Sequence, residues 1–261
     1  MIQIEQIKNF FPLQLQKNNV LYKYMIKEYI QLQILEYLST TVFVKKLVFI
    51  GGTNLRLIKG IDRFSEDLDF DCVDVSEEEF LEIGEKVLRF LQNNGWKAEI
   101  RNTKKEKLKA YRCNIYFPNL LFDLGLTGHK DERFLIKLES QDQEINYQPK
   151  LINIKGCGFF FPFPVPPDNI LCSMKISAML ARQKGRDFYD VMFLLAQTKP
   201  DYYFLKKKCN ISSLEELKSQ TELILKSVNL KDKMRDFEHL IFDKSKSRKI
   251  LLFGEFISSL E

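Results

Sequence analysis

"FIGGTNLRLIKGIDRFSEDLDF" spans residues 49–70 and decides how the chain is expected to fold. An apolar strand ends at a glycine pair, one or two helical turns follow over 53–60, and an alternating strand begins at Asp67. On that strand Asp67 and Asp69 point to the same side, with Cβ atoms roughly 7 Å apart. Like charges so placed repel each other, and each carboxylate loses hydration if it is partly covered. Both effects disfavour folding, so stability alone does not explain the pair. A cation removes that cost, so the pair predicts a Mg²⁺ site that phosphate oxygens complete.

The glycine pair predicts a phosphate contact beside this metal. Gly51 and Gly52 lie where strand gives way to helix, and glycine lets backbone N–H groups approach a phosphate closely. Thr53 and Ser65 offer hydroxyl groups, and Arg63 either meets a phosphate or locks the loop. A glycine pair is more often a plain turn, and a lone pair of alternating aspartates is usually inert. Both features in strand–turn–helix–strand order favour the functional interpretation.

The composition is that of a globular chain of one large or two small domains, with 261 residues, 45% hydrophobic and 29% charged. No apolar run approaches the ~20 residues of a membrane span, and the first residues lack a secretion signal pattern. We therefore expect a cytoplasmic protein with no membrane partner. Five scattered cysteines and two histidines argue against a zinc site or a disulfide scaffold. The net charge of +5 permits an anionic partner without requiring one.

Hydrophobic periodicity predicts a mixed α/β first part and a helical second part. Ser76 and Glu79 have capping-box spacing at the start of a helix over 76–95. The proline-rich segment 157–167 is predicted to form no regular element and to be a linker or a wall between two parts of the chain. We expect an α+β domain over 1–165 and a helical domain over 166–261. Predicted strands lie at 45–52, 67–73, 96–102, 110–117, 133–140 and 150–156, and predicted helices at 18–41, 169–184, 186–197, 201–209, 213–228, 230–243 and 247–260.

The stretch GGTNLRL…RFSEDLDF resembles the first motif of the nucleotidyltransferase superfamily, a glycine pair followed by D-x-D. Its form R-x-S-x-D-L-D-F is similar to the AbiEii/AbiGii toxin family. Members of that family are DNA-polymerase-β-like nucleotidyltransferases, often the toxin of a toxin–antitoxin or phage-defence pair. The resemblance implies a nucleotidyltransferase-fold mixed sheet with flanking helices, followed by a C-terminal helical bundle.

Two later segments carry the same resemblance. FLIKLES (134–140) is similar to the family's I-K-x-E strand, which implies Glu139 as the third acidic position and places Lys137 on the same strand face. The family strand often continues with a further aspartate that this chain lacks. Asp123, in LLFDLGL, therefore remains an alternative third carboxylate.

MKISAMLARQKGRDFYDVMFLL (174–195) resembles the family's motif K-x-x-A-x-x-x-R-x-x-x-R-D-x-Y-D. On a helix, its lysine, alanine and first arginine share one face. The ordinary alternative is a salt-bridged amphipathic helix. The resemblance implies Lys175 and Arg182 as nucleotide contacts, the helical domain contributing Lys175 to the site. The supporting positions are Arg186, Asp187 and Asp190, and Ala178 and Tyr189 complete the match.

The implied reaction is attack of an acceptor hydroxyl on the α-phosphorus of a nucleoside triphosphate (NTP), with release of pyrophosphate. Two Mg²⁺ ions, or Mn²⁺, would stabilise the attacking oxygen and the leaving oxygen of the in-line displacement. The implied metal ligands are Asp67, Asp69 and Glu139; the implied phosphate contacts are Gly51, Gly52, Thr53, Arg63, Ser65, Lys137, Lys175 and Arg182.

The acceptor expected from the resemblance is RNA, at the 3′ end of tRNA, with an antitoxin protein as a possible partner. The basic runs 101–112, 205–208 and 244–249 suit an RNA backbone, although such runs are usually solvated faces. Arg112 lies among aromatics that could stack on bases, yet the same alternation fits an ordinary strand. The alternatives are nucleotidylation of a protein or small molecule, and a non-catalytic nucleotide- or RNA-binding relative.

Overall fold

The computed structural model describes residues 4–101 and 111–261, and contacts between Cα atoms divide them into two units. The first unit contains 4–60, 64–144 apart from 102–110, and 149–165. The second contains 61–63, 145–148 and 166–261. The central part of the predicted basic run 101–112 lies outside the described residues. That 1–165 and 166–261 are separate domains stays a prediction.

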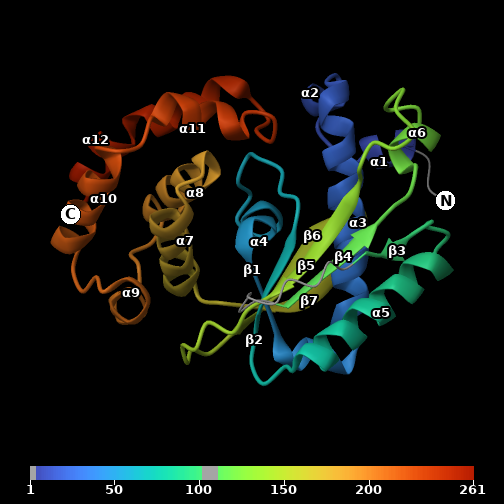
Figure 1. Cartoon of the computed structure of the whole chain (residues 1–261), viewed down its shortest axis with the longest axis horizontal. Coiled ribbons are helices and arrows are strands. Elements are labelled where there is room, and N and C mark those ends of the chain that lie inside the picture. Colours follow the sequence, from blue (N-terminus) through green and yellow to red (C-terminus); the bar gives the residue numbers. More distant parts are fainter. Residues whose placement is uncertain (1–3, 102–110) are drawn as a thin grey trace. The chain divides into compact units, whose positions relative to one another are not determined.

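The first unit is built on a five-stranded mixed sheet with strand order β1-β2-β5-β4-β3 (Figure 1). β2 and β5 are parallel, and the remaining neighbours in this sheet are antiparallel. The predicted α+β class is confirmed. The strands are β1 (Leu47–Ile50), β2 (Leu68–Cys72), β3 (Glu99–Ile100), β4 (Tyr111–Tyr116) and β5 (Leu135–Ser140).

Two long helices, α3 (Tyr22–Ser39) and α5 (Glu77–Asn93), run beside this sheet (Figure 1). The Ser76 hydroxyl accepts a hydrogen bond from the backbone N–H of Glu79, which begins α5 where the capping spacing predicts. The other helical elements of the first unit are α1 (Ile4–Lys8), α2 (Leu13–Gln16), η1 (Asn19–Leu21), η2 (Val42–Lys46), α4 (Gly51–Leu57) and α6 (Leu120–Asp123).

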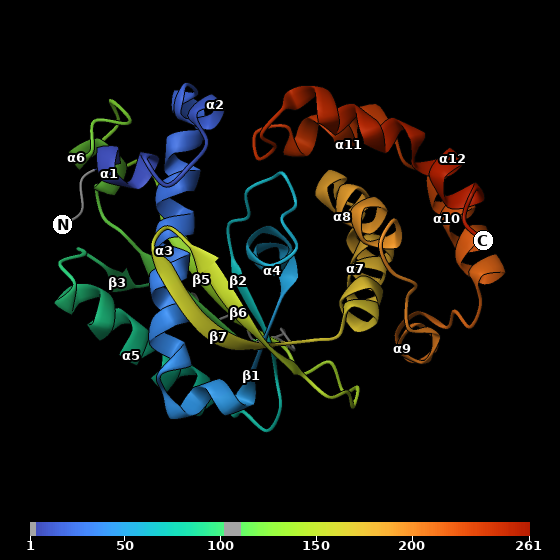
Figure 2. The ribbon, with the colours of Figure 1, turned by 180° about the vertical axis from the view of Figure 1, so that it is seen from behind.

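A second sheet contradicts one prediction. Segment 157–167 was predicted to form no regular element, but β7 (Phe159–Val165) pairs with β6 (Lys150–Gly156) as an antiparallel hairpin, best seen in Figure 2. Pro162 and Pro164 are two residues apart, so both of their nitrogens point to the same edge of the strand. A strand tolerates proline at an edge where no N–H is needed for pairing.

The hairpin contributes the aromatic side chains of its inner face to the core of the first unit. Phe163 is fully buried. Its ring centroid lies 6.0 Å from that of Phe49 on β1 and 6.1 Å from that of Phe70 on β2. Phe160, on the opposite face of the same strand, is 65% exposed. The alternation of buried aromatics with an exposed and a half-buried proline is therefore that of a strand with one buried face.

The second unit is helical, as predicted for the C-terminal part. Adjacent helices α7 and α8 carry the lysine–arginine–aspartate motif, and the remaining helices follow in chain order. They are α7 (Asp168–Arg182), α8 (Gly185–Leu195), α9 (Tyr202–Cys209), α10 (Leu214–Leu225), α11 (Leu230–Phe237), η3 (Lys244–Leu252) and α12 (Phe253–Ser258).

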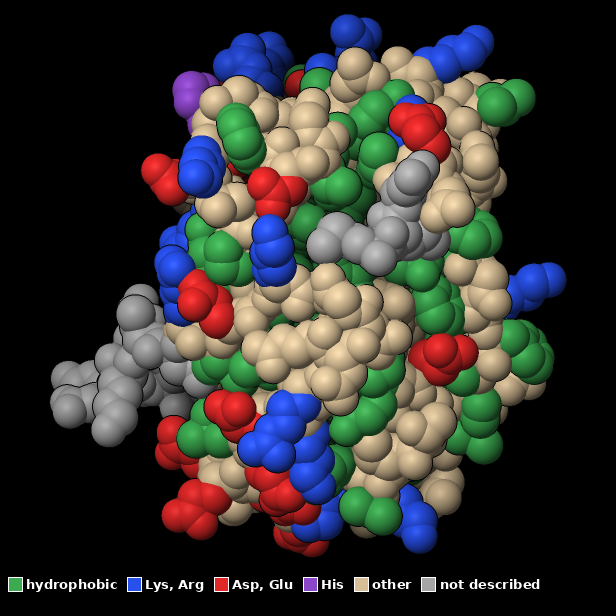
Figure 3. All heavy atoms as spheres, turned by 90° about the vertical axis from the view of Figure 1, so that its right-hand side faces the viewer, with side chains coloured by type: hydrophobic (Ala, Val, Ile, Leu, Met, Phe, Trp, Pro, Cys, Tyr) green, Lys and Arg blue, Asp and Glu red, His purple; other side chains and the backbone are tan. Residues whose placement is uncertain are grey.

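The surface view in Figure 3 shows acidic and basic side chains interspersed on the face presented there, with hydrophobic side chains between them. Among the helices of the described residues, none combines the length and apolar character needed to cross a membrane.

Replacing the buried aromatic of the hairpin should destabilise the protein. We expect Phe163→Ala to lower the free energy of unfolding by about 3–5 kcal/mol, because it removes a fully buried ring and leaves a cavity. Phe160→Ala, on the exposed face of the same strand, should change it by less than about 0.5 kcal/mol. Urea unfolding followed by circular dichroism measures both. Equal effects of the two substitutions would contradict the hairpin's placement.

Candidate active site

Three of the predicted acidic residues lie along one face of neighbouring strands. Asp69 on β2 is the cross-strand partner of Glu139 on β5. Asp67 immediately precedes β2, two residues before Asp69, so its side chain points to the same side of the strand. The opposite side of β2 is occupied by the buried Leu68 and Phe70. Burial of that apolar face fixes the register and thereby turns the carboxylates to the other face.

Gly51 lies against the Asp69 side chain, and the phosphate contact predicted for the glycine pair stays a prediction. Its φ of +82° lies in the left-handed region that favours glycine. A Cβ atom built there would lie 2.0 Å from Oδ2 of Asp69 and 2.7 Å from its Cγ. The absence of a side chain at Gly51 is therefore what leaves room for the Asp69 carboxylate at the first turn of α4.

Thr53 and Ser65, predicted as phosphate contacts, are buried beside the acidic strand. The Thr53 hydroxyl donates to the backbone oxygen of Asp67 at 2.5 Å and the residue has no exposed surface. Ser65 is 7% exposed, and its backbone oxygen accepts from Nε2 of Gln31. This geometry favours a positioning role for Thr53. Its hydroxyl holds the backbone of Asp67, the residue that immediately precedes β2.

Two basic side chains contact the acidic face. Lys137 Nζ lies 3.6 Å from Oδ1 of Asp67, and Nε of Arg112 lies 3.0 Å from Oε1 of Glu139. Lys137 is on the strand face where the sequence places it. Arg112 on β4 is the cross-strand partner of Glu139, a contact that the sequence did not predict because it depends on register.

The donor set suits a divalent cation that also binds substrate. Among residues 4–101 and 111–261, no group of three histidine, cysteine or acidic side chains is arranged to hold a metal ion. Mg²⁺, however, is usually held by one or two carboxylates together with substrate phosphates. Asp67 and Asp69 supply two such oxygen ligands on one face, and the space left by Gly51 lies directly against one of them. The residues present therefore fit Mg²⁺ or Mn²⁺.

Asp123, the alternative third carboxylate, lies on a different element. It is the last residue of α6 and pairs with Lys97, whose Nζ is 3.5 Å from Oδ2 of Asp123. Both side chains are well exposed. Glu139, by contrast, is directly opposite Asp69. This arrangement favours Glu139 as the third carboxylate of the face.

In the second unit, Asp190 joins two buried cations. Arg63 donates to both carboxylate oxygens of Asp190, at 2.7 and 2.6 Å, and Nζ of Lys175 lies 2.9 Å from Oδ2. The side chains of Arg63 and Asp190 are 1% and 0% exposed, and that of Lys175 is 6% exposed. Burial raises the pKa of Asp190, but Arg63 and Lys175 outweigh that effect and the net shift is downward.

This network distinguishes the two roles predicted for Arg63. A buried guanidinium held by both oxygens of one carboxylate favours the loop-locking role over phosphate contact. Asp62 next to it accepts from the Tyr189 hydroxyl at 2.6 Å and pairs with Lys246. Consecutive loop residues are thus tied to α8 and to η3, contacts that sequence spacing alone could not reveal.

The other motif positions brace the junction of α7 and α8. Arg182 donates to both oxygens of the fully buried Asp187, at 2.9 and 2.7 Å, and that carboxylate also accepts from the backbone N–H of Lys184. The N–H of Gly185 donates to the Asp236 carboxylate, and a Cβ there would lie 1.7 Å from the Lys233 backbone oxygen. Arg186 follows, partly exposed. Asp187 is therefore the structural partner of Arg182, and the supporting role predicted for Asp187 stays a prediction.

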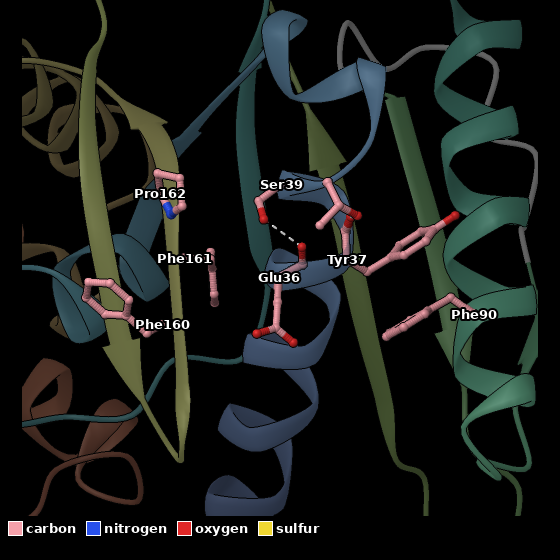
Figure 4. A pocket seen from close by; sticks show the side chains of 8 residues that line it. Glu36, Tyr37, Ser39, Phe90, Phe160, Phe161 and Pro162 are labelled. Atoms are coloured by element: carbon pink, nitrogen blue, oxygen red, sulfur yellow. Dashed lines mark hydrogen bonds between the residues drawn. The ribbon is translucent and has the colours of Figure 1, made fainter.

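A hollow of about 460 Å³ lies elsewhere in the first unit, between the end of α3, α5 and β7 (Figure 4). Tyr37 and Phe90 stack at its wall with ring centroids 4.4 Å apart, and Glu36 and Phe160 also line it. The predicted site residues are absent from its lining.

The comparisons with known proteins identify the family of the chain. The family model described as nucleotidyl transferase AbiEii toxin, type IV toxin–antitoxin (TA) system, matches residues 33–239, which include the acidic strand and the α7–α8 motif. The chain therefore belongs to the AbiEii nucleotidyltransferase toxin family. It is a nucleotidyltransferase, the toxin of a type IV toxin–antitoxin system. A search of the curated proteins found no match.

Solved structures with similar folds support the same fold class. The chain is 17% identical to the nucleotidyltransferase toxin MenT4 of Mycobacterium tuberculosis H37Rv, with a TM-score of 0.65, covering 100% of this chain and 91% of that one. It is 20% identical to JHP933 of Helicobacter pylori, with a TM-score of 0.55 and 91% of each chain covered. A nucleotidyltransferase structure from H. pylori gives 20% identity and a TM-score of 0.56 over 90% of this chain and 93% of that chain.

Adding a methyl group at Gly51 should displace the Asp69 carboxylate. We expect Gly51→Ala to abolish nucleotide transfer and to destabilise the fold more than Gly60→Ala does. Gly60 is a matched control because its φ is also positive, +72°, while no atom lies within 4 Å of a Cβ placed there. Gly60→Ala should cost about 1–2 kcal/mol through its backbone conformation alone and keep activity. Full activity of Gly51→Ala would contradict the close approach.

Neutralising Asp190 should leave two buried cations without their counter-charge. We expect Asp190→Asn to lower the free energy of unfolding by about 3–5 kcal/mol. Asp232→Asn, which breaks an exposed pair with Arg235, should cost less than about 1 kcal/mol. The folded-state pKa of Asp190 lies below the ordinary 3.8, so its stabilisation is full above that pH and is lost as pH falls through the folded value. Unfolding between pH 7 and pH 2 should therefore be less acid-sensitive in Asp190→Asn, and equal acid sensitivity would contradict the network.

Proposed function

We propose that this toxin transfers a nucleoside monophosphate from an NTP to the hydroxyl group of an RNA acceptor, at the 3′ end of tRNA, in a divalent-metal-dependent reaction. The observation that carries the proposal is the face formed by Asp67, Asp69 and Glu139, with Gly51 leaving space against Asp69. That arrangement concentrates negative charge where a triphosphate with its cation binds. Family membership supports the same chemistry.

The residues of the acidic face have separate tasks in this proposal. Asp67 and Asp69 would hold Mg²⁺ or Mn²⁺, and Glu139 would complete the ligands of one ion and orient or deprotonate the acceptor hydroxyl. The bound metal would supply charge neutralisation at the transferring phosphoryl group. The N–H groups of Gly51 and Gly52 would bind triphosphate oxygens, and the roles of Ser65, Lys137 and Arg182 as nucleotide contacts stay predictions. Transfer then depends mainly on positioning and charge, as is usual for phosphoryl chemistry.

The predicted phosphate contact of Lys175 draws support from its position beside Asp190. Lys175 and Arg63 share one carboxylate, that of Asp190. Two buried basic side chains therefore lie at one carboxylate, and a phosphate oxygen is an anion that such side chains bind. Because Arg63 already binds both oxygens of Asp190, Lys175 is the better placed of the two to bind a phosphate oxygen.

An RNA acceptor is favoured over a small cationic acceptor by the basic runs of the described residues. α9 ends in Lys206, Lys207 and Lys208, and η3 carries Lys244, Arg248 and Lys249. Such side chains suit a phosphate backbone. A cytoplasmic location, where NTP and tRNA occur together, and an antitoxin as the cognate partner complete the proposal.

Label transfer tests the proposal. The protein is incubated with Mg²⁺ and each of the four α-³²P-labelled NTPs, with total tRNA, total protein or no acceptor. We expect label on a tRNA-sized band and its loss in Asp67→Ala and in Asp69→Ala. Both variants should keep the free energy of unfolding within about 1 kcal/mol, because the carboxylates are partly exposed and removing one relieves like-charge repulsion. Asp131→Ala, an exposed loop aspartate, is the matched control and should retain activity.

Each other outcome has a definite meaning. Label on protein would keep the chemistry and overturn the RNA acceptor. Full activity in both aspartate variants would overturn the site. Glu139→Gln compared with Asp123→Asn decides which residue is the third carboxylate, and we expect loss of activity with Glu139→Gln.

A further inference from the structure

A row of three charged side chains, one basic and two acidic, crosses three strands of the sheet. Arg112 on β4 is the cross-strand partner of Glu139 on β5, and Glu139 is the partner of Asp69 on β2. Cross-strand partners have their side chains on the same face, so all three belong to the acidic face. One guanidinium is therefore part of the proposed metal and nucleotide site.

The contact of Arg112 is with a carboxylate that the proposed reaction needs for another purpose. Nε of Arg112 lies 3.0 Å from Oε1 of Glu139. The neighbouring carboxylate, Asp67, is similarly approached by Lys137 at 3.6 Å. Without substrate, the acidic face is thus partly neutralised by the protein's own cations, which lowers the repulsion among three carboxylates.

The pair is weak enough to be exchanged. The Arg112 side chain is 41% exposed and that of Glu139 is 24% exposed. Ion pairs of such exposure contribute little, because water and salt screen them. A divalent ion beside Asp69 attracts the carboxylate on the facing strand more strongly than one solvated guanidinium does. A guanidinium released there has its planar donors free for a phosphate, the group whose oxygens it fits best.

We propose that Arg112 is an exchangeable counter-ion of Glu139. It holds the carboxylate while the site is without metal, and it moves to a phosphate oxygen of the bound substrate when the metal attracts Glu139. This inference rests on the proposed function, since it needs the metal site at Asp67 and Asp69. The phosphate belongs either to the NTP or to the RNA backbone, and the two are measured separately.

The first measurement is Mn²⁺ affinity, from the electron paramagnetic resonance signal of free Mn²⁺ without substrate. We expect Arg112→Gln to bind Mn²⁺ about two- to five-fold more tightly than the unsubstituted protein, because a competing cation is gone. Arg101→Gln is the matched control, since Arg101 forms an exposed pair with Glu99 beside the same sheet. It should leave the Mn²⁺ affinity unchanged.

The second measurement is substrate affinity, which Arg112→Gln should lower although it raises Mn²⁺ affinity. A purely structural role of Arg112 would not give opposite effects on the two affinities. With saturating Mg²⁺, Arg112→Gln should bind a non-hydrolysable NTP or total tRNA more weakly, by about three-fold or more, and Arg112→Lys should recover part of the loss. Weakened NTP binding assigns the phosphate to the nucleotide, and weakened tRNA binding assigns it to the acceptor.

Two results would overturn the inference. One is an Mn²⁺ affinity of Arg112→Gln that is unchanged or weaker, and the other is tighter Mn²⁺ binding with both substrates bound as before. Failure of the proposed function itself is separate: it would show as unchanged Mn²⁺ binding in the double variant Asp67→Asn/Asp69→Asn.

Discussion

The site depends on one constraint, the burial of the apolar face of β2. Leu68, Phe70 and Cys72 are buried, so the strand cannot shift by one residue without placing carboxylates in the core. Asp67 and Asp69 are consequently held on the other face, and the parallel pairing with β5 brings Glu139 beside Asp69. Fold and chemistry are thus coupled: the apolar side of the strand fixes the position of the acidic side.

The residues between α4 and β2 are fixed in two different ways. Thr53 binds the backbone oxygen of Asp67 at the start of the strand, whereas Arg63 is locked by Asp190 in the helical unit. Buried ion pairs of this kind add little net stability, but removing one partner is costly because it leaves a buried charge.

Patterns within a single segment of the sequence predicted the elements whose formation depends only on neighbouring residues. The glycine pair, the alternation of β2, the cap of α5 and the helical second part all follow from spacing within one segment. The pairing of Arg112 with Glu139 and the burial of Arg63 could not be predicted, because both depend on which distant segments become neighbours. The prediction for 157–167 is wrong because it counted the prolines and overlooked their two-residue spacing, which a strand edge tolerates.

Family membership and the acidic face agree on the type of reaction, while individual roles within the site rest on geometry. Glu139 and Asp67 are each already paired with a cation. The site therefore contains basic side chains already paired with carboxylates, and substrate binding must rearrange some of these pairs. Such rearrangement costs little at exposed pairs and more at buried ones.

The most direct test is an anomalous-scattering map of crystals grown with Mn²⁺ and a non-hydrolysable NTP. The account predicts a manganese peak within coordination distance of the Asp67 and Asp69 carboxylates, with triphosphate oxygens at the N–H groups of Gly51 and Gly52. Bound nucleotide with manganese away from both aspartates would contradict it.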